Sequence, residues 1–185
     1  YRARVLDLPH LLLFWDRLAA AGYPLTGVGT NDHHWASDWL ESPNPFQTWV
    51  FLDQPSRGDI ADQLGAGRAF FGDPGPFVGQ EPLLDLWTEH GAVMGQVLAT
   101  ELDQVLHVET GYVEPGWSLR LVVDGDEAET RTLDGDETDT VFELPRGDAG
   151  TVRVELQDLD GVPVLLSNPL YLVWADDEVP PLRRP

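Results

Sequence analysis

The chain has 185 residues, and its 32 acidic side chains outnumber 11 basic ones, all arginine, for a formal net charge of −21. This charge argues against nucleic acid and anionic membranes as partners, because both require a cationic surface. The absence of cysteine excludes zinc ribbons, disulfide scaffolds and thiol nucleophiles.

The hydrophobic content of 42% and the seven tryptophans are enough to fill a core. No apolar run approaches the roughly 20 residues that a membrane-spanning helix needs. The sequence shows neither an initiator methionine nor a signal-like amino terminus. We therefore expect the chain to be the back end of a longer protein, comprising a piece of one domain and a second, small domain.

A helix is predicted over residues 8–21, where apolar residues recur at the spacing of one helical face. Asp7 suits its N-cap, Pro9 fits the first turn, and Gly22 is a plausible C-terminal stop. Residues 24–30 are predicted to form a short buried strand. A helix that leads into a strand is typical of an α/β unit, with a loop following the carboxyl end of the strand.

Two further strands, at residues 48–52 and 69–71, are predicted on either side of a second helix at residues 57–66. Ser56 is its expected N-cap, and Asp59 stands three residues later as a carboxylate variant of the capping box. The first part of the chain therefore reads as an α/β segment.

The second part has the pattern of an antiparallel β-sandwich. It follows the turn cluster DPGP at residues 73–76, and Asp-Gly dipeptides, which are strong hairpin signals, separate many of its short strands. The predicted strands are residues 83–88, 105–112, 118–123, 128–133, 138–144, 151–156, 162–166 and 170–174. The expected parts of the chain are an α/β portion at 1–78, the sandwich at 79–175 and a flexible tail at 176–185.

The predicted strand at residues 151–156 indicates the two faces of its sheet. Valine and leucine alternate there with Arg153 and Glu155. This alternation predicts one buried face and one solvated face.

Asp32 and His34 are the residues whose types and spacing point to chemistry. In an extended chain, residues two apart point to the same side, roughly 6–7 Å apart. After a buried strand they would aim a carboxylate and an imidazole at one cation, or at two metal ions about 4 Å apart. This ligand pair suits Zn, Mn or Fe. From the spacing alone, a solvated turn is the alternative.

The pair lies in the segment GVGTNDHH at residues 27–34. This segment resembles the final metal-ligand segment of the PHP (polymerase and histidinol phosphatase) superfamily, where a small-residue strand ends in a Ser/Asn-Asp-x-His loop. Residues 44–50 resemble the next strand, and residues 60–76 resemble the Ala-Gly-Arg and Phe-x-x-x-Gly-Pro passage of PHP-like phosphoesterases with an appended β-sandwich. Residues 167–172 (SNPLYL) resemble the end of such sandwiches, so the resemblance covers roughly residues 7–174.

The resemblance implies a hydrolase in which Asp32 and His34 bind divalent metal ions (Zn, Mn or Fe). A PHP site also uses a His-x-His motif near the start of its domain, and none of the five histidines here forms one. The other ligands would therefore belong to the N-terminal half of the parent PHP domain, the expected partner. Because a catalytic site needs about three protein ligands, this chain alone is expected to bind no metal tightly and to be catalytically silent.

Three more residues are candidates for the site. His33 is the catalytic candidate and should point away from the two ligands. It either makes a structural hydrogen bond or contacts substrate. Trp35 either lines a substrate cleft or packs under the rim of the barrel. Arg68 either neutralises an anionic leaving group or stabilises the end of a helix.

The acidic side chains bear on ligands in two ways. The stretch from Asp124 to Asp139 could offer oxygen ligands to calcium, but it lacks the EF-hand spacing, and solvated Asp-Gly turns are the favoured interpretation. The net charge of −21 repels anionic phosphates and so favours a neutral small-molecule ester or amide as the substrate.

The leading hypothesis is the carboxyl-terminal part of a PHP-like, phosphoesterase-type hydrolase. Its fold would be the last α/β units of a PHP-type barrel followed by an immunoglobulin-like antiparallel β-sandwich. The alternative is a non-catalytic β-sandwich binding or interaction module, with residues 1–80 as a cap.

Overall fold

The computed structural model of the chain describes residues 7–30, 45–135, 139–147 and 150–174. Its helices are α1 (Leu8–Ala20), α2 (Arg57–Gly65) and the short 3-10 helix η1 (Gly75–Phe77). In this part of the chain neither α-helix is long and apolar enough to cross a membrane. The predicted tail, residues 176–185, lies outside the described residues.

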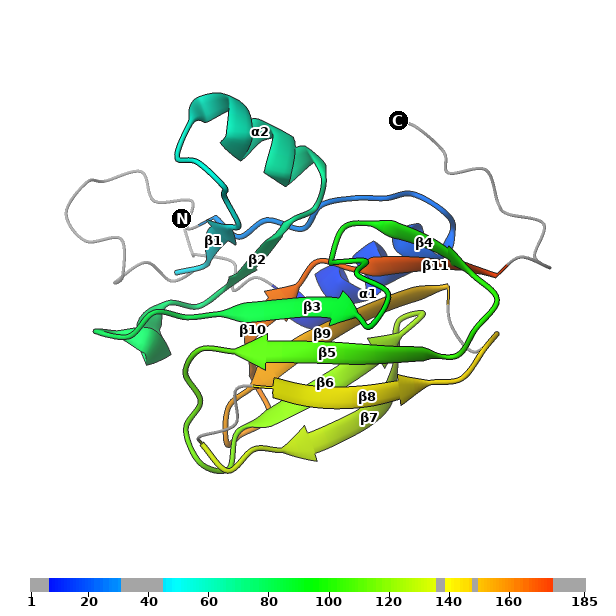
Figure 1. Cartoon of the computed structure of the whole chain (residues 1–185). Helices are drawn as coiled ribbons and strands as arrows, with labels where there is room; N and C mark the ends of the chain where they lie inside the picture. Colours follow the sequence, from blue (N-terminus) through cyan, green and yellow to red (C-terminus); the bar gives the residue numbers. More distant parts are fainter. Residues whose placement is uncertain (1–6, 31–44, 136–138, 148–149, 175–185) are drawn as a thin grey trace.

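Two β-sheets pack face to face, which confirms the predicted sandwich (Figure 1). The larger, sheet A, has the order β1-β2-β10-β9-β11-β4, and β6 pairs with both β9 and β7. Sheet B has the order β3-β5-β8. The strands of sheet A are β1 (Gln47–Val50), β2 (Ala69–Gly72), β4 (Val97–Thr100), β6 (Ser118–Val123), β7 (Asp126–Thr132), β9 (Thr151–Gln157), β10 (Pro163–Ser167) and β11 (Leu170–Trp174). Those of sheet B are β3 (Leu84–Thr88), β5 (Gln104–Thr110) and β8 (Asp139–Leu144).

The strands of the first part of the chain belong to sheet A. β1 and β2 pair antiparallel with each other, and β2 pairs antiparallel with β10. Sheet A therefore continues across residue 78, where the sequence predicted a boundary. β4, which the sequence did not predict, pairs parallel with β11.

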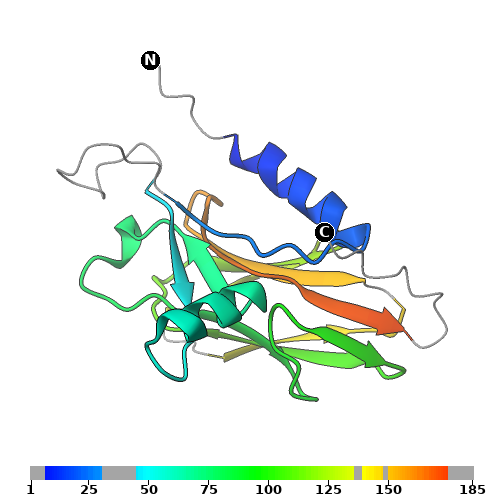
Figure 2. The same cartoon turned by 90° about the horizontal axis from the view of Figure 1, so that it is seen from above.

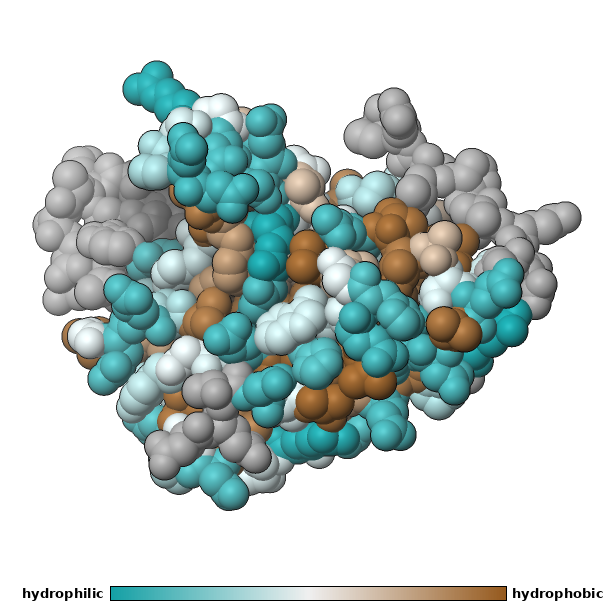
Figure 3. Space-filling view, viewed as in Figure 1, coloured by the Kyte–Doolittle hydropathy of each residue, from teal (hydrophilic) through white to brown (hydrophobic). Residues whose placement is uncertain are grey.

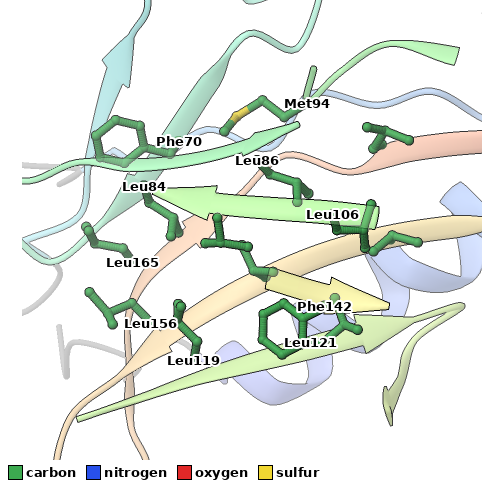
Figure 4. Close-up of a cluster of buried hydrophobic side chains, with 14 of the residues drawn as sticks. Phe70, Leu84, Leu86, Met94, Leu106, Leu119, Leu121, Phe142, Leu156 and Leu165 are labelled. Carbon is green, nitrogen blue, oxygen red and sulfur yellow. The ribbon is translucent and has the colours of Figure 1, made fainter. Parts of the chain in front are cut away.

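The core fills the space between the two sheets (Figure 4). Strand alternation places one set of side chains there, as in β8, where exposed and buried residues alternate. The outer face of sheet B, in front in Figures 1 and 3, mixes hydrophilic and hydrophobic side chains. The core residues labelled in Figure 4 are Phe70, Leu84, Leu86, Met94, Leu106, Leu119, Leu121, Phe142, Leu156 and Leu165.

Helix α1 forms a third layer on the outer face of sheet A (Figure 2). The predicted N-cap is confirmed, because the Asp7 carboxylate accepts a hydrogen bond from the backbone N–H of His10. The predicted solvation of the outer face of β9 is wrong: Arg153 and Glu155 are 3% and 1% exposed. The physical reason is that α1 covers this face and supplies Asp16 as a partner for Arg153.

Residues 24–30 run beside sheet A without forming the predicted strand. Side chains of β1 and of the turn between β10 and β11, rather than a backbone ladder, hold this segment. Helix α2 agrees with its prediction, since the Ser56 hydroxyl caps it by accepting from the N–H of Asp59 at 3.1 Å.

Candidate functional site

Most of the predicted site residues fall outside the described part of the chain. These are the proposed metal ligands Asp32 and His34, the catalytic candidate His33, and Trp35. Among the residues that the structure does describe, no group of three or more His, Asp or Glu side chains could hold a metal ion. The structure does describe residues 24–30, the stem, which lead into the segment with the predicted ligands.

Asn168 clamps the middle of the stem. Its side chain accepts a hydrogen bond from the N–H of Gly27 at 2.6 Å and donates to the carbonyls of Gly27 at 3.1 Å and Ala69 at 2.7 Å. Asn168 is fully buried. One amide therefore ties the stem to β2 and to the turn between β10 and β11.

A second clamp holds the stem at Gly29. The Thr48 hydroxyl accepts from the N–H of Gly29 and donates to its carbonyl, both at 2.9 Å. A Cβ atom at Gly29 would lie 2.7 Å from the carbonyl oxygen of Gln47, and one at Gly27 would lie 2.6 Å from the ring of Phe71. The glycines of the stem are thus required by close approach of the backbone to sheet A.

Tyr171 on β11 lies beside the stem and should report on its position. Burial raises the pKa of its hydroxyl to about 12, although the backbone of Leu25 acts in the opposite direction. Titration of tyrosinate absorbance should show a late-ionising group that Tyr171→Phe removes. Because the unfolded chain loses this proton first, stability should fall between pH 10 and about 12. Desolvation and the neighbouring Glu114 also raise the pKa of Tyr112, so the assignment is contradicted if Tyr171→Phe leaves the amplitude of the late step unchanged.

Arg68, the predicted substrate contact, has structural partners. Its guanidinium forms a bidentate ion pair with Asp85 on β3, with Nη2 2.6 Å from Oδ2. The guanidinium carbon also lies 4.0 Å from the centre of the Phe51 ring. Arg68 directly precedes β2 and thereby links the start of this strand in sheet A to β3 in sheet B, a role that its position beside a helix end did not reveal. Its contact with substrate stays a prediction.

A charged cluster, consisting of Asp16, Arg120, Arg153 and Glu155, lies between α1 and sheet A. Arg153 donates to the Asp16 carboxylate at 2.7 and 2.8 Å and to Glu155 at 2.6 Å. Burial by itself lowers the pKa of Arg153, but the hydrogen bonds and charges of Asp16 and Glu155 outweigh it and raise the pKa above its usual value. Arg153 is therefore a permanent cation that joins α1 to β9.

The cavity next to this cluster measures about 520 Å³. Leu8, Leu12 and Leu13 of α1 line one side of it, and the charged cluster lines the side on sheet A. Its residues come from distant parts of the sequence, so the sequence carried no local signal for it.

Neither a protein-family model nor a curated protein matches this sequence. Function must therefore be inferred from the residues and their contacts. Two places carry such an inference: the clamped stem that leads toward Asp32, and the cavity beneath α1.

Proposed function

We propose that this chain is a carboxyl-terminal part of a PHP-like metal-dependent hydrolase. In this proposal Asp32 and His34 are metal ligands, and the β-sandwich is an accessory domain that braces the segment carrying them. The observation that supports the proposal is the clamp at Asn168. This residue lies in the SNPLYL segment and bonds both to Gly27 of GVGTNDHH and to Ala69, so three segments that carry the resemblance meet at one side chain.

The surface of α1 supports a protein partner for this chain. Exposed apolar patches often mark protein interaction sites, and Leu11 and Phe14 of α1 are 49% and 62% exposed. The N-terminal half of the parent PHP domain is the proposed cover. That half would also supply the remaining metal ligands, because two protein ligands are fewer than a catalytic site needs.

The proposed reaction is hydrolysis of a small-molecule ester. Bound Zn, Mn or Fe ions would polarise the scissile bond and lower the pKa of a bound water. His33 and Trp35 are the proposed substrate contacts next to the ligands. The strongly negative chain favours an uncharged ester or amide over a phosphate.

The test compares this chain with a longer protein that includes the sequence encoded upstream. We expect the chain alone to retain no metal and to hydrolyse neither bis-p-nitrophenyl phosphate nor p-nitrophenyl acetate. The longer protein should retain metal and hydrolyse at least one of them. Asp32→Ala and His34→Ala should each lower its turnover by at least about 100-fold, since even the supporting residues of metal ligands contribute 10–100-fold.

His90→Ala is the matched control, because His90 is a half-exposed histidine on a turn of the sandwich near Glu89. It should leave metal content and turnover unchanged. Robust turnover by the chain alone, or full activity in the Asp32→Ala variant, would contradict the proposal. Tight binding of a glycan or of calcium, combined with an inactive longer protein, would favour the non-catalytic binding module.

A further inference from the structure

The cavity beneath α1 has the size and the lining of a small-molecule site. Its volume of about 520 Å³ falls within the roughly 300–1,000 Å³ of typical ligand clefts. Leu12 and Leu13 of α1 face it from one side, and Val162 and Pro163 line another part of its wall. These side chains can cover the apolar body of an organic molecule, while the charged cluster provides the polar part of the lining.

The charges in this lining compensate each other. Each nitrogen of the Arg153 guanidinium donates a hydrogen bond to Asp16 or Glu155, with donor–acceptor distances between 2.6 and 2.8 Å. Arg120 brings a second guanidinium, so two cations accompany two carboxylates in the lining. A ligand therefore meets polar groups without a net charge of either sign.

Arg120 is the donor in this cluster that the protein uses least. Its Nη1 lies 3.5 Å from Glu155 and its Nε lies 3.3 Å from Glu127, whereas strong charge-assisted hydrogen bonds measure about 2.7–2.9 Å. The buried Nε–H of Arg120 finds no hydrogen-bond partner among the described residues. Because its contacts with Glu127 and Glu155 are long, the guanidinium of Arg120, which lines the cavity, keeps donor capacity for an acceptor placed there.

We propose that this cavity binds an uncharged, mainly apolar small molecule whose carbonyl oxygen accepts a hydrogen bond from Arg120. An anion is disfavoured, because Glu127 and Glu155 flank Arg120 and the chain carries a net charge of −21. A pure hydrocarbon would leave the Arg120 donors unpaired. This inference does not rest on the proposed hydrolase, since it requires neither a metal nor Asp32 and His34.

Three probes with one bicyclic body test the proposal on the full chain. Methyl 2-naphthoate offers a neutral carbonyl, 2-naphthoate a charged carboxylate, and 2-methylnaphthalene no acceptor. We expect the ester to bind at least about tenfold more tightly than the other two, which matches the contribution of a hydrogen bond to a charged group. Fluorescence titration at constant ionic strength measures the three dissociation constants.

Two variants place the binding in this cavity. Arg120→Met should bring the ester and the hydrocarbon to within about twofold of each other, because the donor is gone. Leu13→Trp should abolish binding of the ester by filling the cavity. Arg57→Met, an exposed arginine on α2 that is absent from the lining, is the matched control and should keep the preference for the ester.

The proposal is overturned if the wild-type chain binds no ester, binds 2-naphthoate most tightly, or does not distinguish the ester from the hydrocarbon. Unchanged ester binding in a folded Leu13→Trp variant also overturns it. Circular dichroism establishes which variants fold. If Arg120→Met does not fold, the three-probe comparison on the wild-type chain still decides the outcome.

Discussion

Replacing Arg153 with methionine is expected to lower the free energy of unfolding by about 3–5 kcal/mol, the usual cost of removing one partner from a buried ion pair. Arg153 is 3% exposed and bonds to both Asp16 and Glu155. Its loss leaves two buried carboxylates without their principal cation and releases α1 from β9. Urea unfolding followed by circular dichroism measures the effect.

Two comparisons sharpen this expectation. Arg57→Met removes an exposed arginine from α2 and should change stability by less than about 0.5 kcal/mol. The double variant Asp16→Leu, Arg153→Met should recover part of the loss, because an apolar pair can replace a buried ion pair. A loss below about 1 kcal/mol in Arg153→Met would mean that α1 is not held by this ion pair.

Replacing Asn168 with alanine should cost about 2–4 kcal/mol, because backbone groups of Gly27 and Ala69 lose their partners in a buried site. The effect should be local as well as global. Amide hydrogen exchange should show the Gly27 N–H losing its protection, while amides of α2 keep theirs.

Gln80→Ala is the control for this substitution, since Gln80 is an exposed amide outside the stem. It should leave both stability and the exchange of Gly27 unchanged. If the Gly27 amide stays protected in Asn168→Ala, the stem is held by other contacts, and the brace suggested for the segment before Asp32 loses its support.

The sandwich was predictable because its signals are local. The hairpin dipeptide Asp124-Gly125 has both residues at positive φ, 50° and 93°, as a type I′ turn requires. The bounds of β6 and β11 match those predicted from alternation. β4 was missed because a run of four residues gives only a weak alternation of polar and apolar side chains. Its strand conformation depends on pairing with β11.

The errors arose where one element depends on another. Arg153 and Glu155 looked solvated because alternation in a strand reports polarity, whereas their burial depends on α1, more than 130 residues away. The stem looked like a strand, yet side chains of Thr48 and Asn168 replace its ladder. The cavity likewise combines separate segments, and the roles of Asp32 and His34 stay predictions.

The pairing of β2 with β10 has a consequence for dividing this protein into pieces. A fragment that began at residue 79 would lose β2 and expose the backbone of Leu165, Leu166 and Ser167, which now pair with it. An uncovered strand edge of apolar residues is a template for other chains and a cause of aggregation. By pairing with β10, β2 protects this strand edge from other chains. A fragment limited to residues after 78 should therefore be less soluble than the whole chain.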